Sequence, residues 1–484
     1  MSFFNLLTCY RVLIGWLLCA ALQATPLNNA YDTQPLYSCK TSDKFFKERE
    51  EGEISFSIAP FYQHANTARD AAGKKVPGGD RLGQINMFGL FFDTNRAPKT
   101  FNAGNYPKAW PARDAVQGVV NQALTPGDQY RLRLDSTDKQ NFVATDNKFA
   151  YVSSPLSYEK IGLRSQLNCD FGFGLGVSAR MGVVDVKVKQ RPVQLEKTFA
   201  ADLGLTSIEG YAPIDESKDD SKALYKALFS DQAREAVAND YGLTFKQFHQ
   251  SSPEDMHLQV YWHAPIDFYE KNDEVGVTLV PYLAVGAWMP LSEELDKKYV
   301  FAAPFGNQDR DFGFTVEGAL GLEFPVLPQA GGQSFGVSIG GGLLIFNEKD
   351  LASQYFPTTD LQSVVFPWQV TRLTKRPGET WYVNVGMKAE HFLENLSFYA
   401  DFSYTQHVKD TFTIKETDSA RRDAFAAGVD GYQRSTAWKN QQISAGFNFE
   451  ITDSVALSAA AQAHISGTQV MRSVTLLGGL AVTF

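Results

Sequence analysis

The sequence predicts an all-β fold, a transmembrane antiparallel up-and-down β-barrel of about 12–14 strands. Three observations predict it. The C-terminal residues alternate between apolar and small or polar side chains, the same period of two recurs along the chain, and short and long connections alternate between the predicted strands. Because side chains on a strand point alternately to opposite faces, such segments can separate lipid from a polar interior.

The last fifteen residues carry the clearest alternation. Val474, Leu476, Leu480 and Val482 share one face with the terminal Phe484, while small and polar residues occupy the other face. A terminal aromatic residue is typical of the aromatic girdle at a membrane interface, so we expect Phe484 to lie there.

Further segments with a period of two have about the 9 to 11 residues that a tilted spanning strand needs. They cover residues 54–61, 85–92, 161–167, 171–183, 275–288, 312–324, 335–346, 381–392, 396–408, 441–451 and 454–465. A less certain strand is expected near 256–267 and another within 129–152, and the region 94–154 keeps the strand number open.

Connection lengths give an independent signature. Short turns are expected at 168–169, 271–273, 328–333, 394–395 and 452–453, and long segments at 187–255, 289–311, 347–380 and 409–438. Outer-membrane barrels have short periplasmic turns and longer extracellular loops, so the long set is predicted to be extracellular. The connection 187–255 has helical spacing and could fold inward as a plug, cover the barrel as a lid, or lie outside as an ordinary loop.

The N-terminus predicts export. Residues 1–24 have a basic residue, a short apolar stretch and a small-residue boundary, as a cleaved signal peptide does, with 25–52 as a periplasmic segment and 53–484 as the barrel. Cleavage removes two of the four cysteines and leaves Cys39 and Cys169. Cys39 precedes the first strand and Cys169 falls in a predicted periplasmic turn, so a disulfide between them is predicted, with two unpaired thiols as the alternative.

Composition excludes several classes. The formal net charge of −9 argues against nucleic acid as a partner. Outside the signal no stretch of 18 apolar residues occurs, which excludes a helical membrane protein. The seven histidines lack the spacing of a metal site, and no cofactor is expected.

If the apolar positions of each strand face lipid, the alternate positions face the interior of the barrel. The predicted pore-lining charges are Lys160, Arg164, Arg180, Glu317, Glu323, Lys388, Glu390 and Asp401. Basic residues cluster on early strands and acidic ones dominate later strands. Facing walls of opposite sign would orient polar solutes in a narrow lumen; the alternative is that the groups pair across the interior and close it.

The distances between the candidate catalytic residues argue against an enzyme. Glu317 and Glu323 would lie roughly 20 Å apart along one strand, too far for a glycosidase pair. Ser403 and His407 would lie about 13 Å apart, so a hydrolytic triad would have to borrow His464 or a loop residue. We therefore expect no enzymatic activity.

Together the signal, the alternating strands, the connection lengths and Phe484 resemble the porin-like outer-membrane proteins of Gram-negative bacteria. The resemblance implies an outer-membrane pore for passive diffusion of ions and small hydrophilic solutes. Its partners would be outer-membrane lipid, lipopolysaccharide and the barrel-assembly machinery, which would bind the C-terminal strand. Homo-oligomers fit the resemblance, although the sequence carries no interface signal. A closed barrel acting as a surface adhesin or receptor is the alternative function, and an outer-membrane hydrolase is a third.

Overall fold

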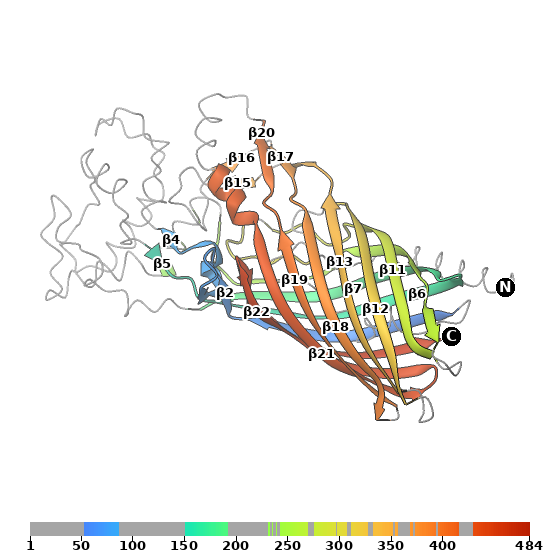
Figure 1. Ribbon diagram of the computed structural model, residues 1–484. Coiled ribbons are helices and arrows are strands. Elements are labelled where there is room, and N and C mark those ends of the chain that lie inside the picture. Colours follow the sequence, from blue (N-terminus) through green and yellow to red (C-terminus); the bar gives the residue numbers. More distant parts are fainter. Residues whose placement is uncertain are drawn as a thin grey trace, which may run out of the picture.

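The computed structural model describes residues 53–86, 151–191, 231–232, 235, 239, 243–269, 275–296, 298–306, 311–327, 333–351, 354–356, 368–370, 373–393, 395–415 and 429–484. Within these residues the main element is a closed antiparallel barrel of 12 strands (Figure 1). Its wall consists of β1 (Ile54–Ala65), β6 (Leu156–Gly172), β7 (Leu175–Gln190), β9 (Met256–His263), β11 (Val275–Met289), β12 (Gly313–Leu327), β13 (Gln333–Phe346), β18 (Thr380–Leu393), β19 (Leu396–His407), β21 (Trp438–Thr452), β22 (Val455–Thr468) and β24 (Val474–Thr483).

Each wall strand pairs with the next one along the chain, and β24 closes the barrel against β1, for example through Ser55 and Thr483. The up-and-down topology predicted from the sequence is therefore confirmed. The segment at 85–92 is not part of the wall in the described residues: β4 (Ile85–Asn86) pairs only with β5 (Tyr151–Val152), in a separate two-stranded sheet.

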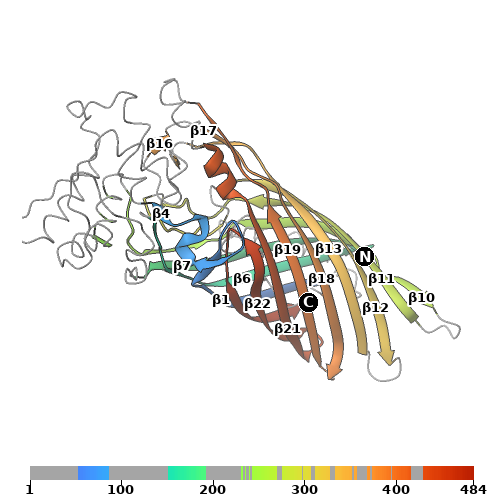
Figure 2. The same cartoon turned by 60° about the vertical axis from the view of Figure 1, so that its left-hand side comes forward.

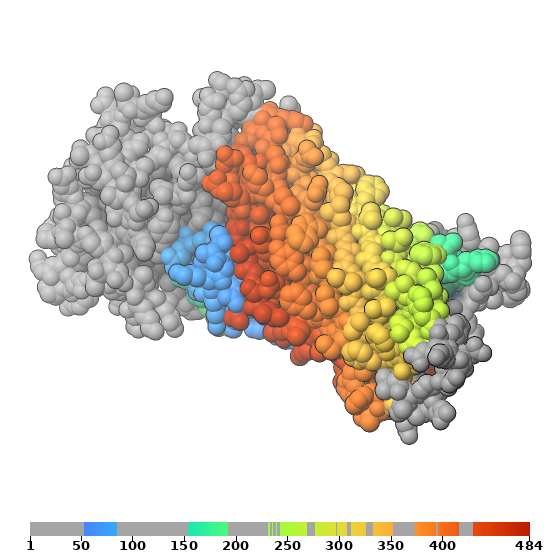
Figure 3. Space-filling view, viewed as in Figure 1, coloured from blue at the N-terminus to red at the C-terminus, as the bar shows by residue number. Residues whose placement is uncertain are grey.

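The outer surface carries an apolar belt. Large apolar side chains at every second position of the wall point outward and are exposed, with Leu283 and Val285 at 58%. Figure 3 shows this outer face over the strands from β11 to β22. Outward aromatic rings border the belt near both of its edges, with Trp381 beside Tyr404 at one edge and Phe392 beside Phe398 at the other. This pattern is what a lipid-facing surface requires.

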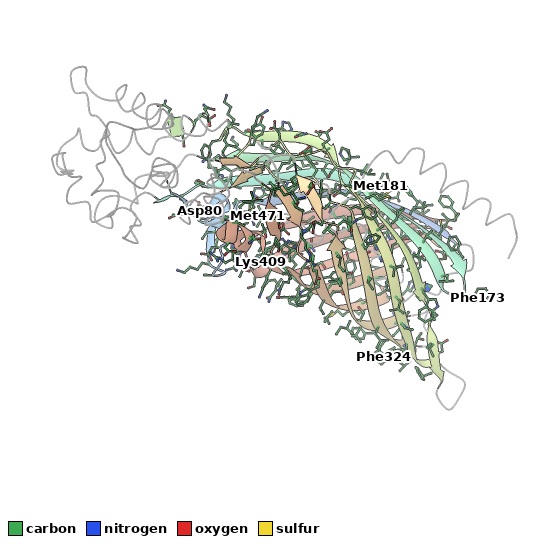
Figure 4. All side chains as sticks on the ribbon, turned by 90° about the horizontal axis from the view of Figure 1, so that it is seen from above. Asp80, Phe173, Met181, Phe324, Lys409 and Met471 are labelled. Atoms are coloured by element: carbon green, nitrogen blue, oxygen red, sulfur yellow. The ribbon has the colours of Figure 1, made fainter. Side chains whose placement is uncertain are left out.

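The two ends of the barrel differ (Figures 1 and 2). At the short-turn end, a hairpin joins β6 to β7 through Gly172, Phe173 and Gly174, whose φ values of 95°, 54° and 73° favour glycine. The turn lies at 173–174, five residues later in the chain than the predicted 168–169, and Cys169 lies in β6 opposite Ile54. Figure 4 labels Phe173 and Phe324 toward this end, and Asp80, Lys409 and Met471 toward the other.

The long-loop end carries additional small elements. They are β2 (Thr67–Arg69), β3 (Lys75–Pro77), the 3-10 helix η2 (Gly78–Leu82), β14 (Lys349–Leu351), β15 (Gln354–Phe356), β16 (Trp368–Val370), β17 (Leu373–Arg376), β20 (Thr411–Ile414), β23 (Val470–Met471) and a helical stretch at 429–436. β14, β17 and β20 form a three-stranded sheet with its own apolar core of Leu351, Leu373 and Phe412. Among the described residues, no helix is long and apolar enough to cross a membrane.

The fourth position of the wall is interrupted. β8 (Phe248–Pro253) and β9 both pair with β7, whereas β9 and β10 (Ile266–Tyr269) both pair with β11. The predicted strand at 256–267 is therefore present, but the chain breaks between β8 and β9 at Glu254 and Asp255. In the described residues the long connection predicted at 187–255 is shorter, because β7 runs to Gln190 and β8 begins at Phe248.

Candidate functional site

The interior of the barrel is the candidate site, because it is where the polar parity of the wall strands converges. Buried polar side chains line it from nearly every wall strand; they include Gln63, Gln166, Ser178, Gln259, Thr315, Ser403, Gln442 and Thr475. They bond to one another across neighbouring strands, as Gln63 does when its Nε2 donates to Thr475 Oγ1 at 3.1 Å. A polar interior inside an apolar outer belt is the arrangement of a water-lined passage.

The basic residues predicted on β6 are inside, but they are not available to a solute. Glu254 binds both of them: its carboxylate lies 2.6 Å from Lys160 Nζ and accepts hydrogen bonds from Arg164 Nε at 3.0 Å and Nη2 at 3.1 Å. All three side chains are 0% exposed. The Arg164 guanidinium also stacks 3.9 Å from the centre of the inward Phe61 ring. The predicted open basic wall is therefore replaced at this point by a buried ion triad.

Glu254 was not predicted as an inward residue because it lies outside every predicted strand. Pro253 was the available signal, since a proline lacks the amide that a central strand position must donate and marks an edge or an interruption. Position 182 also contributes: a Cβ on Gly182 would lie 2.3 Å from Glu254 Oε2, so glycine makes room for the carboxylate.

Two further groups involve the other predicted charges. On β12, Glu317 accepts a hydrogen bond from Gln259 Nε2 at 2.8 Å and is hydrogen-bonded to Tyr382, which Arg180 also approaches. Closer to the short-turn end, Lys388 forms an ion pair with Glu390, Ser334 Oγ donates to Glu390 at 3.3 Å, and Glu323 lies beside both.

Asp401 stands apart from these groups. A Cβ on Gly386 would meet Asp401 Oδ1 at 2.4 Å, so glycine again makes room for an inward carboxylate. Like Glu317, Glu323 and Glu390, Asp401 is only partly buried, whereas Lys160 and Arg164 are fully buried. The carboxylates on the later strands are thus more exposed than the two basic groups on β6.

The wall reverses its polarity toward the long-loop end. Beyond Val183 the outward positions of β7 become charged: Asp185 contacts Lys187 at 3.2 Å and His249 at 2.9 Å on the outer face. Its inward positions become apolar there and are fully buried, including Val186 and Val188. This stretch of wall therefore has a charged outer face and a packed, apolar inner face.

The packing inside comes from the connection between β11 and β12. Phe305 and Tyr299 place their rings 5.9 Å and 5.5 Å from the ring of Phe248, and the Phe305 carbonyl lies 3.5 Å from Lys160 Nζ. Because Lys160 is an inward residue of β6, this contact places residues 298–306, called the inner segment below, on the inner wall. Phe301, Ala303 and Phe305 of the segment are buried.

The rim at the long-loop end holds a second ion network. Lys375 Nζ lies 3.2 Å from Asp311 and 3.6 Å from Asp410, and His407 Nε2 lies 3.1 Å from Asp410. Burial raises the pKa of Asp410, but Lys375, His407 and the Gly378 amide outweigh it and hold the pKa at about 2. The network joins the end of β19 to β17 of the three-stranded sheet.

The residues considered for hydrolysis have other partners. His407 Nδ1 is 2.8 Å from Thr380 Oγ1, and His464 Nδ1 is 2.6 Å from Asn440 Oδ1. Within the described part of the chain, no cluster of three or more histidine, cysteine or acidic side chains is arranged to hold a metal ion.

Two predicted features are placed only in part. Cys169 is buried on β6 near the short-turn end, while Cys39 lies outside the described residues, so their disulfide remains a prediction. Phe484 is 78% exposed at the end of β24, where its amide donates to the Ile54 carbonyl at 2.8 Å. The segments 1–24 and 25–52 also lie outside the described residues.

No family model matches the chain, and no curated protein matches it in sequence. Among solved structures it is similar to an outer membrane channel from Pseudomonas putida F1, with a TM-score of 0.44 at 8% identity over 91% of this chain and 98% of that one. It is also similar to the translocator domain of the autotransporter NalP from Neisseria meningitidis, with a TM-score of 0.33 at 8% identity over 92% of each chain. A third similar structure is the NanC porin, with a TM-score of 0.26 at 6% identity over 67% of this chain and 93% of that one. The barrel fold itself is established by the strand pairing of this chain.

Proposed function

We propose that the protein is a bacterial outer-membrane pore through which ions and small hydrophilic solutes diffuse passively. One observation carries the proposal: a closed wall whose outer belt is apolar and whose inner face is polar and charged over the same span of residues. A barrel filled only to stabilise itself has no need of partly exposed inward carboxylates such as Glu323, Glu390 and Asp401. Export through a cleaved signal peptide and folding by the barrel-assembly machinery belong to the same proposal.

The test is electrical. Purified protein, refolded in detergent, is added to a planar lipid bilayer in potassium chloride, and current is recorded at fixed voltage. We expect stepwise increases of current, each from one inserted molecule. The control is the same preparation after heat denaturation, which should give none. Absence of steps from protein that is folded and inserted would refute the pore.

The same recording tests which inward charges face the passage. Under a salt gradient, E390Q should shift the reversal potential toward anions relative to the wild type, because a partly exposed carboxylate attracts cations near it. The matched control is E159Q, since Glu159 lies on the outward face of β6. A shift of equal size in both variants would show that the lumen carboxylates do not set the potential.

A second function, a surface receptor or adhesin, is favoured by one specific observation. The three-stranded sheet at the rim has its own apolar core and a buried ion network, so part of the long-loop end is a packed structure rather than bare connections. Binding of host cells or ligand that is lost when residues 373–376 and 411–414 are replaced by glycine and serine, with the barrel intact, would support this function.

A further inference from the structure

The break between β8 and β9 is the feature that the pore function leaves unexplained. A continuous strand would give β7 and β11 an unbroken neighbour, yet here the chain leaves the ladder for two residues. At the break the Glu254 amide donates to the Gly182 carbonyl at 3.1 Å, and its side chain enters the interior. Moving charged groups out of water costs several kcal/mol per ion, so a triad of fully buried charges is an expensive way to end a strand.

The residues at the break hold both ends of the β11–β12 connection. Asp255 accepts the Ser292 amide at 3.0 Å, and Ser252 Oγ accepts the Glu293 amide at 2.9 Å. At the other end, Lys160 reaches the Phe305 carbonyl. A Cβ on Gly306 would lie 2.3 Å from the Asp255 carboxylate, so that end of the inner segment is in close contact with the break.

Lys160 contacts both Glu254 and the inner segment. Its ammonium group lies 2.6 Å from Glu254 and 3.5 Å from the carbonyl of Phe305, so the carboxylate that neutralises Lys160 also fixes it beneath the inner segment. Without that carboxylate, Lys160 and Arg164 lose a buried negative charge that both of them contact, so their positive charges are less well compensated. Movement of the inner segment away from the wall would expose Lys160 to water and reduce that cost.

We propose that the inner segment, residues 298–306, narrows the pore at its long-loop end, and that Glu254 is the positioning residue that latches the segment to the inner wall and so limits which solutes pass. The inference rests on the proposed pore function. Loss of the Glu254 charge releases the segment and widens the passage. The latch itself is a property of the fold and can be measured without any current.

The first measurement follows the segment. Ala303 is 0% exposed, so a cysteine there reports on release. A303C in the full-length chain, folded into lipid vesicles, is labelled with a membrane-impermeant maleimide, and the labelling of the native cysteines is subtracted using the chain without A303C. We expect labelling roughly tenfold faster when E254Q is added, as for a local opening made more favourable by about 1.4 kcal/mol.

Two further variants control for a merely structural effect. E159Q removes a carboxylate one position from Lys160 but on the outer face, and should leave the labelling rate unchanged. E254D keeps the charge and should restore slow labelling. Both are measured beside E254Q in the same vesicles, with the folded fraction scored by the faster gel migration of unheated barrels.

The second measurement is single-channel conductance. We expect E254Q to raise it by about twofold, because the narrowest part of a pore dominates its resistance. G306A should do the same by pushing the segment from its other anchor while leaving the triad intact. E159Q should conduct as the wild type does.

The outcomes distinguish failure of the latch from failure of the pore function. If E254Q folds and neither labelling nor conductance changes, the latch is refuted while the pore stands. Faster labelling with no current from any variant supports the latch and refutes the pore. If E254Q fails to fold, K160M decides, because Lys160 joins Glu254 to the Phe305 carbonyl: labelling at the wild-type rate in K160M would refute the latch.

Discussion

Val385 offers the most direct test of where the lipid lies. It points outward from β18 between Ile339 and Phe402 and is 49% exposed. On the same strand, Trp381 marks one edge of the apolar belt, and Ala389, the partner of Phe398, marks the other. Val385 therefore lies at the middle of the belt, and we expect V385R to destabilise the barrel strongly.

The expected magnitude follows from this depth. Trp381 and Ala389 are eight positions apart, which is about 26 Å along the strand and, at a tilt near 40°, about 20 Å along the barrel axis. Arginine at the midplane of a barrel's lipid face costs about 2–4 kcal/mol, and the cost falls to about 0–1 kcal/mol near the interface. The matched control is V408R, because Val408 is also exposed but follows the end of β19 at the long-loop end.

The assay is reversible urea unfolding in lipid vesicles, followed by tryptophan fluorescence. V385R should lower the free energy of unfolding by about 3 kcal/mol and V408R by less than about 1 kcal/mol. Equal, small effects of both variants would mean that Val385 is not in lipid, and the membrane-spanning interpretation of the outer belt would be wrong.

Three other changes have defined outcomes. G176A should lower the free energy of unfolding by about 1–3 kcal/mol, because its Cβ would overlap the tyrosine ring that covers this glycine. G478A is the control, because a Cβ has space there, and it should lower the free energy of unfolding by less; both are measured by urea unfolding. The pKa of Asp410 is lowered, so its contribution to the free energy of unfolding is present above its ordinary pKa and is lost as the pH falls through about 2. D410N should therefore lower the free energy of unfolding by about 2 kcal/mol at neutral pH. An unchanged urea midpoint would contradict this. Peptide mapping without reductant should find Cys39 joined to Cys169, whereas alkylation of both thiols would exclude that bridge.

The wall of the barrel was accessible from the sequence because lipid demands a strict period of two. Strand ends were harder to predict, since β7 continues past Val183 with its apolar and charged faces exchanged. A pattern that assigns apolar residues to lipid stops at such a reversal. The hairpin at Gly172–Gly174 was misplaced because its glycines share the parity of the strand that they end.

The sequence predicts which side chains point into the barrel, but not which of them contact one another. Parity placed Lys160 and Arg164 inside, and both are there. Their partner Glu254 comes from an interruption in a strand about 90 residues later, and no local pattern links the two. Which inward groups meet depends on register and on inward connections, both of which are set by the closed barrel as a whole.

The reversal of faces on β7 also fixes how far this strand extends beyond the apolar belt. Val183 and Gln190 are seven positions apart, a rise of about 23 Å along the strand, or roughly 18 Å along the barrel axis once tilt is included. Buried side chains such as Val186 and Val188 pack its inner face there. If the apolar belt faces the acyl chains, the end of β7 therefore stands clear of the lipid headgroup layer.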